Sequence, residues 1–320
     1  MAEFVEGNAA KRASNMTHAP PSPTPRPTQW TGRTRGGVFG NWVFVTLVRL
    51  FGLWPAYVLL GPVSCYFLVA APKALRASRQ YLKRLGLPRR GLWASLRHFY
   101  AFGVSILDRI AAFGGQAHRF TIDVEGHDAL VRALKDGKGA ILVNAHCGNW
   151  EMAAHMLGEA IETPVNMMTF AGETPHVDRL FNQATTARRF HAIPLGNGES
   201  TMIAIHCALS RGEIVMFLGD RHLGAHTETV DFLGAPARFP AGPYLIAAVT
   251  GTPVFHIFTM RTRLFHYTVQ VYPPERLTAT NRADRTAQVR AAIARYSARL
   301  EEQLRQHPYQ WLNFYDFWRA

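Results

Sequence analysis

The chain has 320 residues, of which 48% are hydrophobic and 18% charged, and its formal net charge is +13. This length fits one large α/β catalytic domain, the low charged fraction favours contact with an apolar phase, and the basic excess predicts attraction to an anionic partner. The three cysteines, Cys65, Cys147 and Cys207, form no C-x-x-C pair. Their number and spacing suggest neither a disulfide framework nor a structural zinc site, and they favour a reducing cytoplasmic setting.

Residues 1–36 carry five prolines between Pro20 and Pro27 among Ser, Thr and Arg, with little apolar periodicity. Such a composition cannot bury enough apolar surface to offset the entropy of ordering, so a disordered tail is predicted. The first apolar run begins near Val38, which is too far along the chain for a secretory signal peptide.

Residues 37–72 are predicted to anchor the protein to a membrane. Arg49 is the only charge in this range, and from Phe51 onward the segment is long enough to cross a hydrocarbon core of about 30 Å. Pro55 and Pro62 each remove a helix hydrogen bond, so a shallow or re-entrant anchor competes with a clean span. A buried helical hairpin of a soluble domain is the alternative interpretation.

The next segment, Lys73 to Arg84, is predicted to be a helix with one basic face. At 100° per residue its basic side chains fall within an arc of about 140°; they are Lys73, Arg76, Arg79, Lys83 and Arg84. Such a face suits anionic lipid, where each basic residue contributes about 1 kcal/mol. A solvated helix face explains the pattern equally well.

Residues 73–320 are predicted to form one α/β domain with a mixed sheet flanked by helices, because short apolar runs alternate with amphipathic segments. The expected strands are 120–124, 140–143, 213–218 and 254–258. The expected helices lie near 150–160, 175–189, 200–210, 242–250 and 282–305. No internal repeat is present.

The segment from Ala140 to Glu151 has the pattern of a strand, a glycine-containing turn and a helix start, which is where α/β sheets place their ligand sites. Within one helix, His146 and Glu151 would lie about 140° apart and face different ways. With His146 in the preceding loop, Glu151 can accept the Nδ1 proton, given the backbone freedom that Gly148 supplies. The Nε2 atom is then free to take a proton from an acceptor hydroxyl, while backbone N–H groups at the helix start hold the oxyanion.

Other interpretations of the same residues predict different chemistry. A histidine at a strand end is often structural. His155, His222 and His226 do not combine with His146 into H-E-x-x-H spacing, so no metal site is expected. Cys147 is adjacent to His146, but neighbouring side chains on a turn tend to point apart, which disfavours a thiol nucleophile. Because zinc-finger and RNP-like motifs are missing, no nucleic-acid partner is expected.

The sequence H-C-G-N-W-E at His146 to Glu151 resembles the His-x4-Asp/Glu motif of glycerolipid-type acyltransferases, in the form found in the lipid A late acyltransferases (lauroyl/myristoyl transferases). Two further blocks are similar to that family. One runs from Gly219-Asp220-Arg221-His222 through Val230-Asp-Phe-Leu-Gly234 to Thr250-Gly-Thr-Pro-Val254, and the other is His307-Pro-Tyr-Gln310-Trp311. The resemblance covers about residues 37–320.

The resemblance implies that His146 is the general base and Glu151 the acid that orients it. It places a basic cluster at Arg188 and Arg189, where guanidinium groups match a phosphate of the acceptor or the carrier arm. Asp220 matches the first acidic residue of the family's acidic turn, but His222 stands where a second acidic residue is common. The candidates for substrate binding are Gly148, Asn149, Arg188, Arg189, Asp220 and Arg221.

The implied activity is transfer of a fatty acyl group from acyl-carrier protein or acyl-CoA to a hydroxyl of a lipid or glycolipid such as a lipid A precursor, without a metal or cofactor. The expected place is the cytoplasmic face of a bacterial inner membrane. The departure at His222 and the ending after Asn313, which lacks a basic tail, leave other acceptors open: another glycolipid, or a polyene or polyketide-type lipid. A non-catalytic, membrane-tethered lipid- or carrier-binding protein is the rival of another class. The aromatic residues after Gln310 fit an acyl pocket, a membrane contact and a buried position equally well.

Overall fold

The computed structural model describes residues 37–87, 91–170, 190–195, 198–221 and 226–319. All of them belong to one unit, Gly32–Ala320. The predicted tail at 1–36 and the predicted helix at 175–189 lie outside the described residues.

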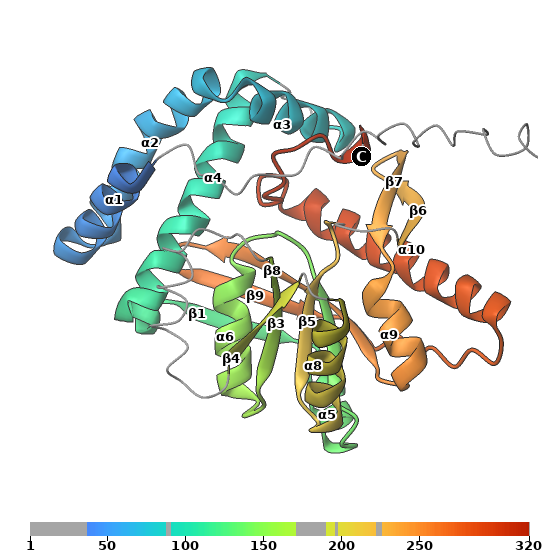
Figure 1. Cartoon of the computed structure of the whole chain (residues 1–320). Coiled ribbons are helices and arrows are strands. Elements are labelled where there is room, and N and C mark those ends of the chain that lie inside the picture. The colour runs from blue at the N-terminus through green and yellow to red at the C-terminus, as the bar shows by residue number, and fades with distance from the viewer. Residues whose placement is uncertain (1–36, 88–90, 171–189, 196–197, 222–225, 320) are drawn as a thin grey trace, which may run out of the picture. The chain divides into compact units, whose positions relative to one another are not determined.

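Four helices open the described chain: α1 (Gly37–Phe51), α2 (Leu53–Ala70), α3 (Pro72–Arg84) and α4 (Leu92–Ala111) (Figure 1). Gly52, with φ of +78°, separates α1 from α2, since this backbone conformation ends a helix at little cost for glycine. α2 packs against α4 so closely that a Cβ at Gly103 would lie 2.3 Å from Leu60 Cδ1. Among the described helices α2 alone is long and apolar enough to span a bilayer, and 28% of it is buried.

A seven-stranded sheet follows, with the order β1-β9-β8-β2-β5-β3-β4. All neighbouring pairs are parallel except β8 and β9. The strands are β1 (Thr121–Glu125), β2 (Ala140–Asn144), β3 (Val165–Phe170), β4 (Phe190–Leu195), β5 (Ile214–Leu218), β8 (Val254–Arg263) and β9 (His266–Val271). A separate antiparallel hairpin comprises β6 (Thr227–Phe232) and β7 (Ala235–Pro240). The predicted mixed α/β sheet is therefore confirmed.

Helices cover both faces of this sheet, because successive residues of a buried strand point to opposite sides. Ile141 and Val143 of β2 belong to the core formed with α8 (Gly198–Ser210), α9 (Gly242–Thr250) and α10 (Arg282–Gln306). Ala140 and Leu142 belong to the core formed with α5 (His127–Lys135) and α6 (Trp150–Ala160). A third cluster joins α1, α2 and α4 to Tyr267 of β9.

The register between β2 and β5 positions the candidate site. The two strands are parallel neighbours, and Asn144 pairs with Leu218 at their carboxyl ends. His146 and Asp220 each follow two residues later, so the topology brings these two side chains to the same edge of the sheet. This edge lies at the carboxyl ends of the strands, where open α/β sheets bind their ligands.

Candidate active site

His146 lies in the loop between β2 and α6, as predicted, and 9% of the residue is exposed. Its backbone is fixed from two sides. The His146 N–H donates to Asp220 Oδ2 at 2.9 Å, and its carbonyl accepts from the Leu312 N–H at 2.7 Å. The imidazole is therefore held by a rigid main chain, which a catalytic group needs to keep its geometry.

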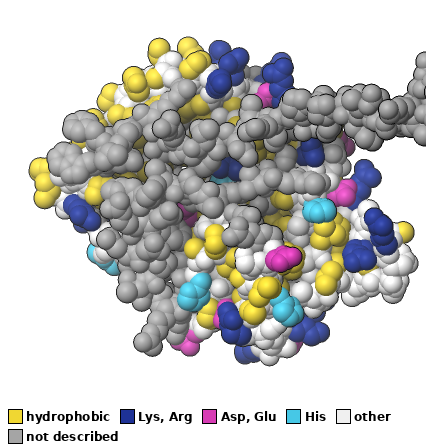
Figure 2. Space-filling view, in the orientation of Figure 1, with side chains coloured by type: hydrophobic (Ala, Val, Ile, Leu, Met, Phe, Trp, Pro, Cys, Tyr) yellow, Lys and Arg dark blue, Asp and Glu magenta, His cyan; other side chains and the backbone are white. Residues whose placement is uncertain are grey.

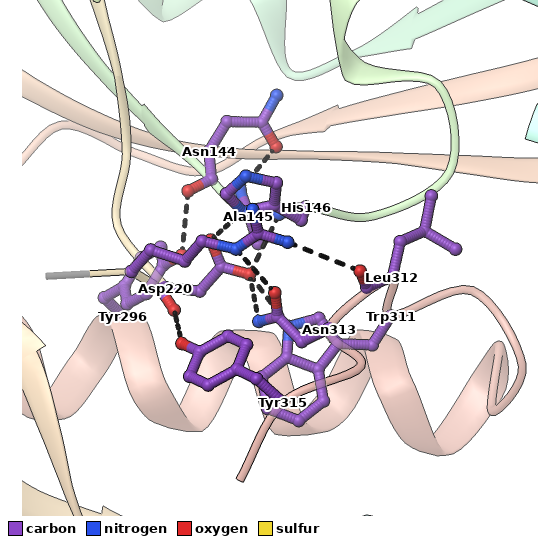
Figure 3. A network of polar contacts seen from close by, with 10 residues as sticks. Asn144, Ala145, His146, Asp220, Tyr296, Trp311, Leu312, Asn313 and Tyr315 are labelled. Atoms are coloured by element: carbon purple, nitrogen blue, oxygen red, sulfur yellow. Dashed lines mark hydrogen bonds and ion pairs between the residues drawn. The ribbon is translucent and has the colours of Figure 1, made fainter. Parts of the chain in front are cut away.

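The His146 side chain is paired with Asp220, whose Oδ1 lies 2.7 Å from Nδ1 (Figure 3). Because an ionised carboxylate only accepts hydrogen bonds, Nδ1 carries the proton and Nε2 of the neutral ring is left with its lone pair. Nε2 forms no hydrogen bond within the described part of the chain. The arrangement gives a general base oriented by an acid.

Asp220 is fully buried and accepts three further hydrogen bonds on Oδ2, which come from His146 N, Trp311 Nε1 at 2.8 Å and Asn313 Nδ2 at 2.9 Å. Burial raises the pKa of this carboxyl, but the nearby His146, the hydrogen bonds from it and the Arg221 charge outweigh burial and lower the pKa to about 2. Asp220 is thus ionised over the whole physiological range.

The pKa of His146 is lowered, first by burial of the ring and then by the Arg221 guanidinium, although Asp220 acts in the opposite direction. The imidazole is therefore neutral at neutral pH and available as a base. An imidazolium formed during a reaction would be stabilised by the Asp220 carboxylate.

The expected contact between Glu151 and Nδ1 of His146 is wrong: Asp220 occupies that position. Glu151 lies in the first turn of α6, nearly buried, and forms an ion pair with Arg109 of α4. The physical reason is topological, since neighbouring parallel strands deliver Asp220 directly beside His146, while the helix carries Glu151 toward α4. Glu151 still acts on His146 through its charge, which tends to raise the imidazole pKa.

Gly148 and Asn149 complete the loop before α6. Gly148 has φ of +52°, and a Cβ there would lie 2.3 Å from the carbonyl oxygen of Thr259, so only glycine fits. Its N–H donates to Gln310 O at 3.1 Å. Asn149 is buried and donates to Ser105 O at 3.1 Å. In the described structure both residues hold the loop in place, and their predicted contact with substrate stays a prediction.

The remaining predicted binding residues have different outcomes. Asp220 is fully buried and pairs with His146, and its predicted contact with substrate stays a prediction. Arg221 donates to Asn313 Oδ1 at 2.9 Å and lies over the Tyr315 ring. Arg188 and Arg189 lie outside the described residues, as do His222 and the side chain of His155.

The segment after α10, which sequence reasoning left without a role, supplies much of the site. The Trp311 and Asn313 side chains contact Asp220, and the Gln310 side chain bonds both backbone groups of Arg261, at 2.7 Å and 2.8 Å. His98 of α4 also lies 2.7 Å from Trp311 O through Nε2. The similarity at His307 to Trp311 was the available indication that this segment belongs to the site.

Cys147 is fully buried, and burial raises the pKa of its thiol well above the usual value. A protonated, inaccessible thiol is a poor nucleophile. Its backbone forms a bridge with Trp311 instead. Among the residues that the structure describes, no group of histidines, cysteines and carboxylates has the arrangement of a metal site.

A cavity of about 620 Å³ reaches the loop that carries His146, at Gly148, and continues to Leu312, whose N–H donates to the His146 carbonyl. α2 and α4 form one wall, and the end of β8 with Tyr267 and the Gln310 segment forms the other. Its size suits a small ligand or part of a lipid. A substrate in this cavity lies next to the loop that carries His146.

Known acyltransferases are similar to this chain. A family model described as "Bacterial lipid A biosynthesis acyltransferase" matches residues 98–320. Similar curated proteins include phosphatidylinositol mannoside acyltransferases of Mycobacterium tuberculosis, 31% identical over 205 residues in one strain, and of Mycolicibacterium smegmatis, 30% identical over 137 residues. The first match covers 62% of this chain and 60% of the relative, and the second 42% and 45%. The matched region thus spans about three fifths or less of each relative.

Proposed function

Because the chain belongs to the bacterial lipid A biosynthesis acyltransferase family, we propose that it transfers a fatty acyl group from a thioester to a hydroxyl of a glycolipid. The single observation that carries the proposal is the 2.7 Å contact between His146 Nδ1 and Asp220 Oδ1, with Nε2 unengaged within the described structure. Acyl transfer to an alcohol requires such a base. A non-catalytic binding protein has no need of an oriented imidazole.

In the proposed reaction, Nε2 of His146 removes the proton of the acceptor hydroxyl as its oxygen attacks the thioester carbonyl carbon. The resulting imidazolium is stabilised by Asp220, which stays ionised. The tetrahedral intermediate collapses by breaking the carbon–sulfur bond, and the thiolate takes the proton from the imidazolium. The acyl group moves directly to the acceptor, so the protein itself is never acylated.

The developing oxyanion is best placed at the first turn of α6. The N–H groups of Cys147 and Gly148 are already bonded, to Ala145 O and Gln310 O. The first N–H groups of a helix have no partner within that helix, and the helix dipole favours negative charge there. Because α6 begins at Trp150, soon after His146 in the chain, its start is the natural donor group.

For the acceptor, we favour a mannose-bearing glycophospholipid over a lipid A precursor. The curated relatives are named as phosphatidylinositol mannoside acyltransferases, and the departure from the acidic turn at His222 distinguishes this chain from the lipid A pattern. The donor is acyl-carrier protein or acyl-CoA, both of which are anionic, in keeping with the net charge of +13.

We also propose that α2 lies within the interface of a bacterial inner membrane, on its cytoplasmic side, instead of crossing the bilayer. One face of α2 is buried against the protein, including Leu53, Tyr57 and Leu60. The opposite face exposes Trp54, Val58 and Val69 at 62%, 75% and 83%. A helix with one packed face and one exposed apolar face can lie in a membrane surface, with the apolar face among the lipids.

The basic helix α3 supports the same placement. It follows α2 directly, and its exposed basic side chains are Lys73, Arg76, Arg79 and Lys83. Figure 2 shows hydrophobic side chains over α2 beside Lys and Arg side chains over α3. Apolar insertion next to a basic surface is the combination that holds a protein on anionic lipid.

The enzymatic proposal is tested by incubating the purified chain with palmitoyl-CoA or palmitoyl-acyl-carrier protein and either phosphatidylinositol mannoside or a lipid A precursor, followed by mass spectrometry. We expect an acylated mannoside, and none with His146→Ala. Acylation of the lipid A precursor alone would reassign the acceptor. Normal transfer by His146→Ala would refute the mechanism.

The membrane proposal is tested by vesicle flotation and alkaline carbonate extraction of the intact chain. We expect it to float with vesicles that contain phosphatidylglycerol and to be released by carbonate. The variant Val58→Asp/Val69→Asp should no longer float. Retention in the membrane after carbonate would show that α2 spans it.

A further inference from the structure

The cavity beside Gly148 has a basic lining. Arg97, Arg261 and Arg263 line it, and no aspartate or glutamate is present among its described lining residues. Arg97 and Arg263 are exposed, whereas Arg261 is largely buried, with a side chain 23% exposed. The three arginines therefore line one space, and Arg261 is the most deeply buried of them.

Arg261 has unused hydrogen-bonding capacity. Its Nε and Nη2 atoms are buried and make no hydrogen bond in the described structure. The nearest carboxylate is Asp108, with Oδ2 3.4 Å from Nε. Both oxygens of Asp108 already accept hydrogen bonds, from Tyr57 and Tyr267. Buried donors without an acceptor are costly. A bound anion would supply the acceptors that Asp108 does not provide to Arg261.

Arg261 is also held in position before any ligand arrives. Its backbone N–H and carbonyl are both bonded by the Gln310 side chain, and its guanidinium lies over the Tyr57 ring, 5.6 Å from the centroid. Arg97 is similarly placed over Tyr309, at 4.9 Å. Planar guanidinium groups in fixed positions match the oxygens of a phosphate.

The cavity is connected with the apolar surface of the protein. Cys65 of α2 and Trp93 of α4 line it and are exposed, Trp93 at 65%. Cys65 belongs to α2, the helix whose apolar face is described above. The cavity therefore joins Arg261 and Gly148 to exposed apolar side chains.

We propose that Arg261, with Arg97 and Arg263, binds the phosphodiester of the acceptor lipid. The site fixes the headgroup so that a sugar hydroxyl lies beside His146. This rests on the proposed function for the identity of the acceptor. The phosphate of the donor's phosphopantetheine arm has the same chemistry, and the experiment separates the two sources.

The test measures equilibrium binding to the full chain carrying His146→Ala, so that turnover is not needed. The probes are dioctanoyl phosphatidylinositol, dioctanoylglycerol, which lacks both the phosphate and the inositol, and 4′-phosphopantetheine. We expect the phosphoinositide to bind at least about ten-fold more tightly than dioctanoylglycerol, and Arg261→Gln to weaken it by about ten-fold. Arg290→Gln removes an exposed charge on α10 and should change nothing.

Because Arg261 also contacts Asp108, Arg261→Gln is paired with the exposed double variant Arg97→Gln/Arg263→Gln, whose folding should be unaffected. Weaker phosphoinositide binding by the double variant, with an unchanged melting temperature, supports the site. Equal binding of the phosphoinositide and dioctanoylglycerol would overturn it. If the arginine substitutions weakened the binding of 4′-phosphopantetheine alone, the assignment of this site to the acceptor lipid would be overturned. None of these outcomes depends on transfer activity, so failure of the proposed function would be recognised separately.

Discussion

Arg109 and Glu151 form an ion pair that joins α4 to the first turn of α6, directly behind the loop that carries His146. The side chains are 26% and 7% exposed, so the pair is partly protected from water. An acid of the His-x4-Glu pattern thus braces the start of a helix, while a different acid orients the imidazole.

Breaking this pair should cost stability as well as activity. Arg109→Gln leaves Glu151 as a nearly buried, uncompensated charge, and we expect the free energy of unfolding to fall by about 2 kcal/mol, less than for a fully buried pair. Urea denaturation of both single variants and of Arg109→Gln/Glu151→Gln measures the coupling. Strictly additive effects would show that the ion pair contributes nothing.

Asp220→Asn should lower kcat by about 100-fold to 10,000-fold, because the neutral amide neither selects the Nδ1–H tautomer nor stabilises the imidazolium. Glu151→Gln is expected to lower kcat less. Asp316→Asn, an exposed substitution of the same kind, serves as control. If Glu151→Gln abolished transfer while Asp220→Asn kept it, Glu151 would be the orienting acid after all.

The pH dependence of kcat/KM should follow His146. Its pKa is lowered by burial and by Arg221, and the neutral imidazole is the active base. Activity should therefore persist below the usual histidine pKa of about 6.5 and decline only in more acidic buffer. Arg221→Gln removes one of the causes of this lowering, so the acidic limb should move to higher pH. An unmoved limb would mean that another group titrates.

Acidification should also destabilise the fold through His98. Burial lowers the pKa of His98 to about 4. Between this pH and the pKa of histidine in the unfolded chain, about 6.5, the unfolded chain binds the proton more tightly than the folded chain does. Stability is then complete above about pH 6.5 and is lost as the pH falls toward the folded pKa, by about 2 kcal/mol at about pH 5. Thermal unfolding of the protein and of His98→Gln at both pH values isolates this contribution. A His98→Gln variant with the same pH slope would contradict it.

Gly148→Ala should displace the catalytic loop. The new Cβ meets Thr259 O at 2.3 Å in addition to the strain of a positive φ. Gly234→Ala is the matched control, because Gly234 also has a positive φ, +73°, but open space around its Cβ position. We expect Gly234→Ala to lower stability by about 1 kcal/mol with normal activity. Gly148→Ala should lose both stability and activity. Equal effects of the two variants would show that the close approach of Gly148 to Thr259 O is unimportant.

Local sequence patterns predicted the helices and strands whose apolar spacing is visible within a few consecutive residues. β2 and β5 are continuous apolar runs, and α6, α9 and α10 follow amphipathic spacing, so their ranges were close to the observed ones. β3 and β9 were not predicted. Asn166 interrupts the apolar run of β3, whereas β9 has the alternating pattern of a half-buried strand, and that signal was missed. Asn166 is satisfied by Glu213 and by Ile214 O, which only the folded structure supplies.

The candidate site was also predictable only in part, because several of its contacts exist only in the folded structure. His146 could be found from its strand–turn–helix context. The choice between Glu151 and Asp220 as its partner depends on the strand order, in which β5 lies next to β2 although β3 and β4 intervene in the chain. The hydrogen bonds that Trp311 and Asn313 donate to Asp220 join residues far apart in the sequence, and no local spacing reveals them.

The contribution of the segment after α10 has a consequence for biosynthesis. When β2 and β5 have emerged from the ribosome, His146 and Asp220 have both been synthesised, but Trp311, Leu312 and Asn313 are still to be translated. Until they emerge, the carboxylate lacks two of its donors and the histidine carbonyl lacks its partner. α2 is translated long before this segment, so the lipid contact proposed for its apolar face can form while the candidate site is still incomplete.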